Sequence, residues 1–260
     1  RLRVLHIAAL ISYRTRDTEH HRLFNLEGTR AILRASLESG VERLCHISSI
    51  VAVGHSSRGQ SKREDAAFNG ADLGVDYVTT KRAAEDLVLA AKDEIDVVVA
   101  SPGAIFGPTT RPSNSAELLD RVAKGKAPWL GPPGGTSVVG VEDTAHGCVL
   151  ALDRGRRGER YVLAERFLSH FELLRQVAAR SGTRGPVAAV PKPLWALLQL
   201  ASRPLDRLWP QDLITPQALT MLALDWNLDA AKAREELGWQ PEPFEAVLER
   251  TLASLPDRSQ

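Results

Sequence analysis

The first hundred residues alternate short apolar runs with longer segments of helical periodicity. Strands without polar alternation are buried on both faces, so helices must cover both sides of the sheet that they form. The pattern therefore predicts an α/β fold with a doubly wound parallel sheet. Apolar runs predict strands at 4–8, 44–47 and 95–100, and apolar residues three or four apart predict helices at about 18–38 and 77–92.

The pattern loosens after Pro102, where prolines and glycines separate shorter elements. We interpret residues 1–107 as a partial catalytic core, and residues 108–260 as a mixed region that contributes sheet-packing elements and a smaller substrate-binding lobe. The leucine-rich stretch around Trp195 is expected in the core of that lobe, with a partner or membrane surface as the alternative. Strands are expected at 137–141 and 161–164, and helices at 142–152, 169–180, 194–201, 229–237 and 244–252.

The amino-acid composition limits which classes of binding partner are expected. The chain has 33 basic and 32 acidic residues, so its charge balance favours neither nucleic acid nor an anionic membrane. Its two cysteines, Cys45 and Cys148, lie in an apolar run and a helical pattern, which is not the spacing of a disulfide framework. No apolar run reaches the length of a membrane span. We expect a cytoplasmic protein with a small-molecule ligand.

Tyr77 and Lys81 stand four residues apart in a helical pattern, so their side chains share one face. An ammonium beside a phenol favours the phenolate, and it can lower the phenol pKa from about 10 toward the range of an acid/base catalyst. A reaction that moves a proton between an alcohol and a carbonyl needs such a group. The spacing alone is a weak indication, because exposed pairs of this kind arise by chance.

Two further strand ends carry candidate residues. Ser48 and Ser49 follow the strand at 44–47, and Pro102 and Gly103 follow the strand at 95–100. The carboxyl ends of parallel strands meet at one edge of a sheet, where such enzymes gather their chemistry. A serine hydroxyl there can bind a substrate oxygen, and the proline–glycine pair lets backbone approach a flat ligand. The alternatives are a serine that caps the loop and a simple turn.

These segments resemble the extended short-chain dehydrogenase/reductase family, above all its dihydroflavonol-reductase-like and hydroxysteroid-dehydrogenase-like members. The resemblance spans most of the chain and implies an incomplete Rossmann-type sheet with a C-terminal substrate lobe. It rests on VLHIAA at 4–9, NLEGT at 25–29, GVERLCHISSIVAVG at 40–54, YVTTK at 77–81, SPGAIFGP at 101–108, VVGVEDTAHG at 138–147 and LDAAKAREELGWQP at 228–241.

The resemblance also implies roles for individual residues. Tyr77 is the general acid/base, Lys81 tunes it and holds the nicotinamide ribose, and Ser49 positions the substrate carbonyl, with Ser48 as the less favoured hydroxyl. Asn25 is expected to order the site. The remaining expected contacts to NADP or NAD are Ser48, Ala8 and Ala9 through backbone, and Pro102, Gly103, Ala104 and Ile105 at the nicotinamide.

The implied reaction interconverts a ketone and a secondary alcohol. A nucleotide-sugar epimerase or dehydratase is the alternative among enzymes, and a non-catalytic binding protein is the alternative outside them. No metal site is expected, since the adjacent pair His20 and His21 is interpreted as a solvated helix face. His6 and His46 are expected in the core or cleft, and the arginines from Arg154 to Arg160 on a solvated turn.

One landmark of the family has no counterpart in this sequence, namely the glycine-rich turn that holds the cofactor pyrophosphate. The opening strand matches the family's fourth, which favours a partial gene product over a natural loss of cofactor binding, and circular permutation is not favoured. The strand at 4–8 would then form an apolar sheet edge, so we expect self-association or a homodimer. The substrate and the choice between NAD and NADP stay open.

Overall fold

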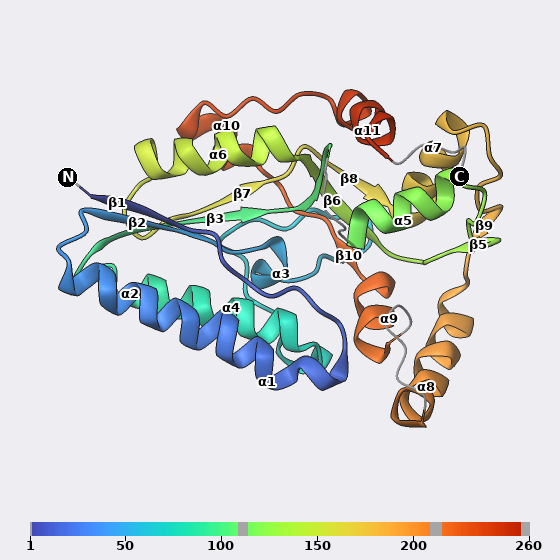
Figure 1. Ribbon diagram of the computed structural model, residues 1–260, viewed down its shortest axis with the longest axis horizontal. Coiled ribbons are helices and arrows are strands. Elements are labelled where there is room, and N and C mark those ends of the chain that lie inside the picture. The colour runs from blue at the N-terminus through green and yellow to red at the C-terminus, as the bar shows by residue number, and fades with distance from the viewer. Residues whose placement is uncertain (1, 109–113, 209–214, 256–260) are drawn as a thin grey trace.

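A four-stranded parallel sheet lies at the centre of the molecule (Figure 1). The computed structural model describes residues 2–108, 114–208 and 215–255. The strand order is β1-β2-β3-β7. Ile47 lies opposite Ala100, and Ala100 lies opposite Tyr161, so the carboxyl ends of these strands share one edge. The strands are β1 (Arg3–His6), β2 (Arg43–Ile47), β3 (Asp96–Pro102) and β7 (Arg160–Leu163).

Helices cover both faces of this sheet, which confirms the doubly wound α/β class (Figure 1). One face carries α2 and α4, and the other carries α6 and α10. A π-helical turn at Arg22–Glu27 joins α1 to α2, and Gly40 takes a left-handed φ of +61° just after α2 ends. The bounds are α1 (Thr18–His21), α2 (Gly28–Glu38), α4 (Asp76–Ala90), α6 (Val141–Arg154) and α10 (Ala231–Leu237).

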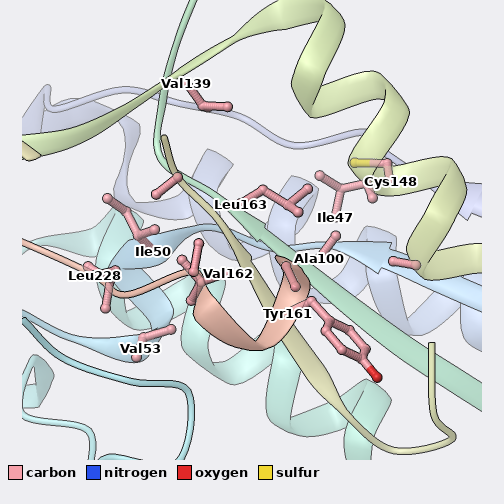
Figure 2. Close-up of a cluster of buried hydrophobic side chains, with 14 of the residues drawn as sticks. Ile47, Ile50, Val53, Ala100, Val139, Cys148, Tyr161, Val162, Leu163 and Leu228 are labelled. Atoms are coloured by element: carbon pink, nitrogen blue, oxygen red, sulfur yellow. The ribbon is translucent and has the colours of Figure 1, made fainter. Parts of the chain in front are cut away.

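The largest apolar cluster fills the space between the sheet and α6. Figure 2 shows Ile47, Ala100 and Leu163 of the sheet beside Cys148 of α6. Cys45 and Cys148 are both buried and free, and burial raises the pKa of the Cys148 thiol to about 12. A thiol with so high a pKa carries little thiolate, so these cysteines act as small core residues.

A second, smaller sheet continues from the end of β3. Its strand order is β10-β6-β4, and β8 pairs with β6 in the antiparallel sense. Apart from β6, its strands are only two to four residues long and were not predicted from the sequence. The elements are β4 (Ala104–Phe106), β6 (Gly135–Gly140), β8 (Arg166–Ser169) and β10 (Asp225–Trp226), with helices α5 (Asn114–Ala123), α7 (His170–Arg180) and α11 (Phe244–Ala253).

Two helices extend beyond this sheet, α8 (Lys192–Leu208) and α9 (Pro216–Ala223). Trp195 is buried between them, and its Nε1 donates a hydrogen bond to the Leu219 carbonyl oxygen at 2.9 Å. The expectation that the surrounding leucines form a lobe core is wrong, because these side chains are exposed: Leu194, Leu197, Leu198 and Leu200. A short pair, β5 (Leu130–Gly131) and β9 (Ala188–Ala189), lies beside α7.

The structure corrects two interpretations of polar segments. His20 is exposed as expected, but His21 is fully buried, because the π-helical turn follows it and its ring faces Tyr77. Arg160 also lies in the interior, where it pairs with Glu85, while other arginines of that segment stay at the surface. Among residues 2–108, 114–208 and 215–255, no helix is both long and apolar enough to span a membrane.

Candidate active site

Helix α4 brings Tyr77 and Lys81 to the carboxyl end of β2. Both side chains are buried, with exposed fractions of 6% and 2%. The Lys81 ammonium donates a hydrogen bond to the Ile47 carbonyl oxygen at 2.8 Å. Since Ile47 is the last residue of β2, this bond fixes Lys81 to the strand end rather than to solvent.

Ser49 lies between β2 and the short helix α3 (Ile50–Val53), which it caps. Its hydroxyl oxygen accepts a hydrogen bond from the Val51 backbone N–H at 3.4 Å. The same side chain forms a hydrogen bond with Tyr77. Ser49 therefore caps α3, which was one of the expected alternatives, and Ser49, Tyr77 and Lys81 all lie near the carboxyl end of β2.

The electrostatics of Tyr77 differ from the expectation. Burial raises the pKa of Tyr77, and the hydrogen bond with Ser49 only partly offsets this. The predicted lowering of the phenol pKa by Lys81 is therefore wrong for the protein without a ligand, because desolvation outweighs the nearby charge. Burial also lowers the pKa of Lys81 to about 8, against the opposing effect of the Glu85 carboxylate.

Aromatic rings enclose Tyr77 on the side of the first loop. The ring of Tyr13 meets it edge-on, with centroids 6.1 Å apart, and the ring of His21 also lies at 6.1 Å. His21 Nε2 lies 2.9 Å from the Ser12 carbonyl oxygen. These neighbours were not predicted, although the four-residue spacing of His21 and Asn25 in a helical segment could have indicated a shared face.

Asn25 orders the loop that follows β1, as the resemblance implied. Its Oδ1 accepts a hydrogen bond from the Leu10 N–H at 2.7 Å, and its Nδ2 donates to the Leu10 carbonyl oxygen at 3.1 Å. The Nδ2 group also lies 3.3 Å from Thr80 Oγ1 on α4. Ala8 and Ala9 are exposed in this loop, just beyond the end of β1 at His6.

Ser48 points to a different partner. Its backbone N–H donates to the Ala100 carbonyl oxygen at 2.8 Å, which extends the pairing of β2 with β3. Its hydroxyl faces the carboxylate of Glu85. This arrangement agrees with the preference for Ser49 as the hydroxyl beside Tyr77.

The segment from Pro102 to Ile105 leads from β3 into β4, next to the end of β2. The Gly103 N–H donates to the Leu163 carbonyl oxygen at 3.0 Å. A Cβ atom at Gly103 would lie only 2.5 Å from the Ser137 carbonyl oxygen. The glycine is therefore required by the packing of β4 on β6. Ala104 and Ile105 are partly exposed.

The described residues fit the nicotinamide–ribose part of a dinucleotide. An ammonium has three N–H donors, and the Lys81 ammonium uses one on Ile47, so a ribose hydroxyl can accept another. Exposed backbone at Ala8 and Ala9 is open to the same ligand. A glycine-rich turn for the pyrophosphate is not present in this sequence. In the part of the chain that the structure describes, no group of three His, Cys, Asp or Glu side chains could hold a metal ion.

Comparison with known proteins agrees with this geometry. The model of the NAD dependent epimerase/dehydratase family matches residues 3–164. Sterol demethylase protein B of Methylococcus capsulatus is 30% identical, and the alignment covers 98% of this chain and 79% of the relative. A putative dihydroflavonol 4-reductase of Synechocystis is also 30% identical, with coverage of 90% and 70%.

A solved structure supports the same assignment. The crystal structure of gox2253 matches 97% of this chain and 77% of its own chain, with 27% sequence identity and a TM-score of 0.81. The family model spans more than half of the sequence, and its match contains β1, β2, β3, β7 and every expected site residue. The chain belongs to the NAD dependent epimerase/dehydratase family, within the extended short-chain dehydrogenases/reductases, and is thereby a nicotinamide-dependent enzyme of that family.

Proposed function

We propose that this protein interconverts a ketone and a secondary alcohol with NADP or NAD, using Ser49, Tyr77 and Lys81. The observation that carries the proposal is that Ser49 and Tyr77 face each other at the carboxyl end of β2, where Lys81 binds the Ile47 carbonyl oxygen. A buried phenol that contacts a hydroxyl and stands one helical turn from an ammonium is suited to moving a proton to or from a substrate oxygen.

In the direction of reduction, the Tyr77 hydroxyl gives its proton to the carbonyl oxygen of the substrate. Ser49 donates a hydrogen bond to that oxygen and holds it beside the phenol. The positive charge of Lys81 stabilises the phenolate that results, which the buried site would otherwise disfavour. The bound nicotinamide cofactor supplies the hydride for the carbonyl carbon.

The substrate that we propose is a bulky, mainly apolar molecule. The two relatives are named for a sterol and for a dihydroflavonol, which are both polycyclic. Helices α8 and α9 adjoin the site, because Asp206 accepts a hydrogen bond from Thr15, and Gln217 binds Asp76 at the start of α4. Within residues 108–260, we assign α8 and α9 to the substrate lobe, whereas α6, α10 and β7 belong to the central sheet and its helices, and the exposed leucines of α8 are suited to an apolar substrate.

The test is the oxidation of NADPH or NADH by polycyclic ketones, followed spectrophotometrically with this protein. Tyr77→Phe should lower kcat/KM by roughly 10²–10⁴-fold, since it removes the proton donor. Tyr161→Phe is the matched control, because Tyr161 is also buried but its hydroxyl donates to Glu236 outside the site. Equal activity of Tyr77→Phe and the control would contradict the proposal.

A nucleotide-sugar epimerase or dehydratase is the second candidate, favoured by the name of the matching family model. It would use the same three residues with a retained cofactor. Turnover of UDP- or dTDP-sugars without net NADPH consumption, combined with inactivity toward polycyclic ketones, would select it. A protein that shows no thermal shift with either cofactor and no turnover would instead be a binding protein of this fold.

A further inference from the structure

A buried ion pair lies directly beneath the catalytic residues. Glu85 follows Lys81 by one turn of α4 and is fully buried. Its carboxylate pairs with the guanidinium of Arg160, the first residue of β7, whose side chain is 10% exposed. Moving such charges out of water costs several kcal/mol per ion, so a pair of this kind is weak evidence for stability and calls for another explanation.

The pair is held in place from the side opposite Lys81. Arg160 Nη1 donates a hydrogen bond to the Glu64 carbonyl oxygen at 2.7 Å. The Glu64 carboxylate in turn accepts a hydrogen bond from the Val162 N–H of β7 at 3.0 Å. Arg160 is thus bound between its own strand and the loop before α4, and it fixes the position of the Glu85 carboxylate.

Glu85 faces the catalytic residues with its other side. It lies near the hydroxyl of Ser48, which has no hydrogen-bond partner among the described residues, and its negative charge raises the pKa of Lys81. The other titratable groups around Lys81 are Tyr77 on α4, His6 on β1, His46 on β2 and Arg160 on β7. Among these described groups, Glu85 is the carboxylate; burial raises its pKa, and the charge of Arg160 opposes this effect.

The two histidines cannot replace Glu85 in this respect. Burial lowers the pKa of His46 well below its usual value, and the charge of Lys81 adds to the effect. Burial also lowers the pKa of His6, again with a contribution from Lys81. A histidine ring is either neutral or positively charged, so neither ring can supply a negative counter-charge to the ammonium.

We propose that Glu85, anchored by Arg160, is a positioning residue that keeps Lys81 protonated and directed at the Ile47 carbonyl. The part of this inference that concerns catalysis rests on the proposed function, because a neutral lysine could not stabilise the Tyr77 phenolate. The electrostatic part concerns the protein alone and is measurable without substrate.

The first experiment follows the titration of the Lys81 side chain by NMR with ¹⁵N-labelled lysine, assigned with Lys81→Met. Glu85→Gln should lower the titration midpoint by about one pH unit, since an opposite charge at this range changes a pKa by one or more. Glu85→Asp should restore it in part. An unchanged midpoint in Glu85→Gln would overturn the proposal.

Glu85→Gln leaves Arg160 buried without its ion-pair partner. The double variant Glu85→Gln/Arg160→Gln, which removes both charges, is therefore measured beside it. The double variant should fold and should also show the lowered midpoint. Asp96→Asn is the matched control, because Asp96 forms a partly buried ion pair with Arg43 at 2.6 Å in the same sheet. A similar decrease in Asp96→Asn would mean that any lost ion pair has this effect, and the proposal would be wrong.

The second experiment is the pH profile of kcat/KM for ketone reduction. Glu85→Gln should lose activity at lower alkaline pH than the wild type, because Lys81 loses its proton earlier, whereas Asp96→Asn should keep the wild-type profile. If the wild type turns over no ketone, the proposed function fails and the NMR midpoints still decide the role of Glu85. A lowered midpoint with an unchanged profile would overturn the catalytic part.

Discussion

The strands toward the two ends of the central sheet are packed differently, although both groups of strands carry residues of the site. Strands β3 and β7 are buried along almost their whole length, although β7, like β1, has a single neighbouring strand among the described residues. Strand β1 pairs only with β2 among the described residues, and most of its positions are partly exposed. Just beyond it, Ile7 and Ile11 are 65% and 55% exposed.

This difference divides the site into two parts. The proton-transfer groups Ser49, Tyr77 and Lys81 are anchored on β2 and α4, where packing fixes their geometry. Ala8 and Ala9, the residues expected to meet the cofactor, lie at the open edge. The chemistry is thus organised by the packed side of the sheet, whereas the order of the cofactor side depends on what covers β1.

The largest expected effect comes from a cavity on the packed side. Leu163→Ala in β7, where the side chain is fully buried, should lower the free energy of unfolding by about 2–5 kcal/mol. Leu2→Ala, beside β1 and 56% exposed, should change it by less than about 0.5 kcal/mol. Urea unfolding followed by circular dichroism measures both. Similar losses for the two variants would break the comparison.

The second effect is a loss of stability in acid. His46 is buried on β2, and burial keeps its pKa far below 6.5, so the unfolded chain takes up the proton first. Stability should therefore be full above pH 6.5 and should decrease as the pH falls below that value. His170 adds to the effect, since burial lowers its pKa to about 4.

Replacement of His46 should make this acid dependence less steep. His46→Met removes the ring that resists protonation, and both ring nitrogens of His46 have no hydrogen-bond partner among the described residues. His20→Gln, at an exposed position, is the control. Thermal melting between pH 4 and 7 would measure both variants. An equally steep decrease in His46→Met and the wild type would show that His46 is not responsible.

The smallest effect concerns the open edge itself. Ile7→Lys should change stability by less than about 0.5 kcal/mol, yet it should reduce self-association, because a charge at a sheet edge disfavours pairing with another chain. Sedimentation velocity over a range of concentrations measures this. Leu197→Lys, on α8 and 63% exposed, is the matched control. If only Leu197→Lys reduced association, α8 and not the edge of β1 would be the contact.

The main sheet and the shared face of Tyr77 and Lys81 were predictable because both leave regular spacings in the sequence. Apolar runs marked β1, β2, β3 and β7, and the helical spacing of Tyr77 and Lys81 placed them on one face. The short strands β4, β8 and β10 were missed, since two to four residues are too few to show a period. The exposed leucines of α8 were wrongly assigned to the core, because amphipathicity does not say what the apolar face meets.

The environment of the site could not be predicted from spacing. The direction in which the pKa of Tyr77 shifts depends on how deeply its ring is buried. That burial involves Tyr13 and His21 from another segment. Glu85 and Arg160 are 75 residues apart and resemble ordinary surface charges in the sequence. Their pairing follows only from the adjacency of α4 and β7 in the folded chain.

Gly103, in the segment that leads from β3 into β4, limits which substitutions this enzyme can accept. Any side chain there would meet the backbone of Ser137, so functional descendants must keep the glycine while other parts of the lobe change freely. New substrate preferences can then arise in α8, α9 and their loops without disturbing the strand ends that hold Tyr77 and Lys81. The packing at Gly103 thus leaves less room for substitution than the exposed surface of α8 does.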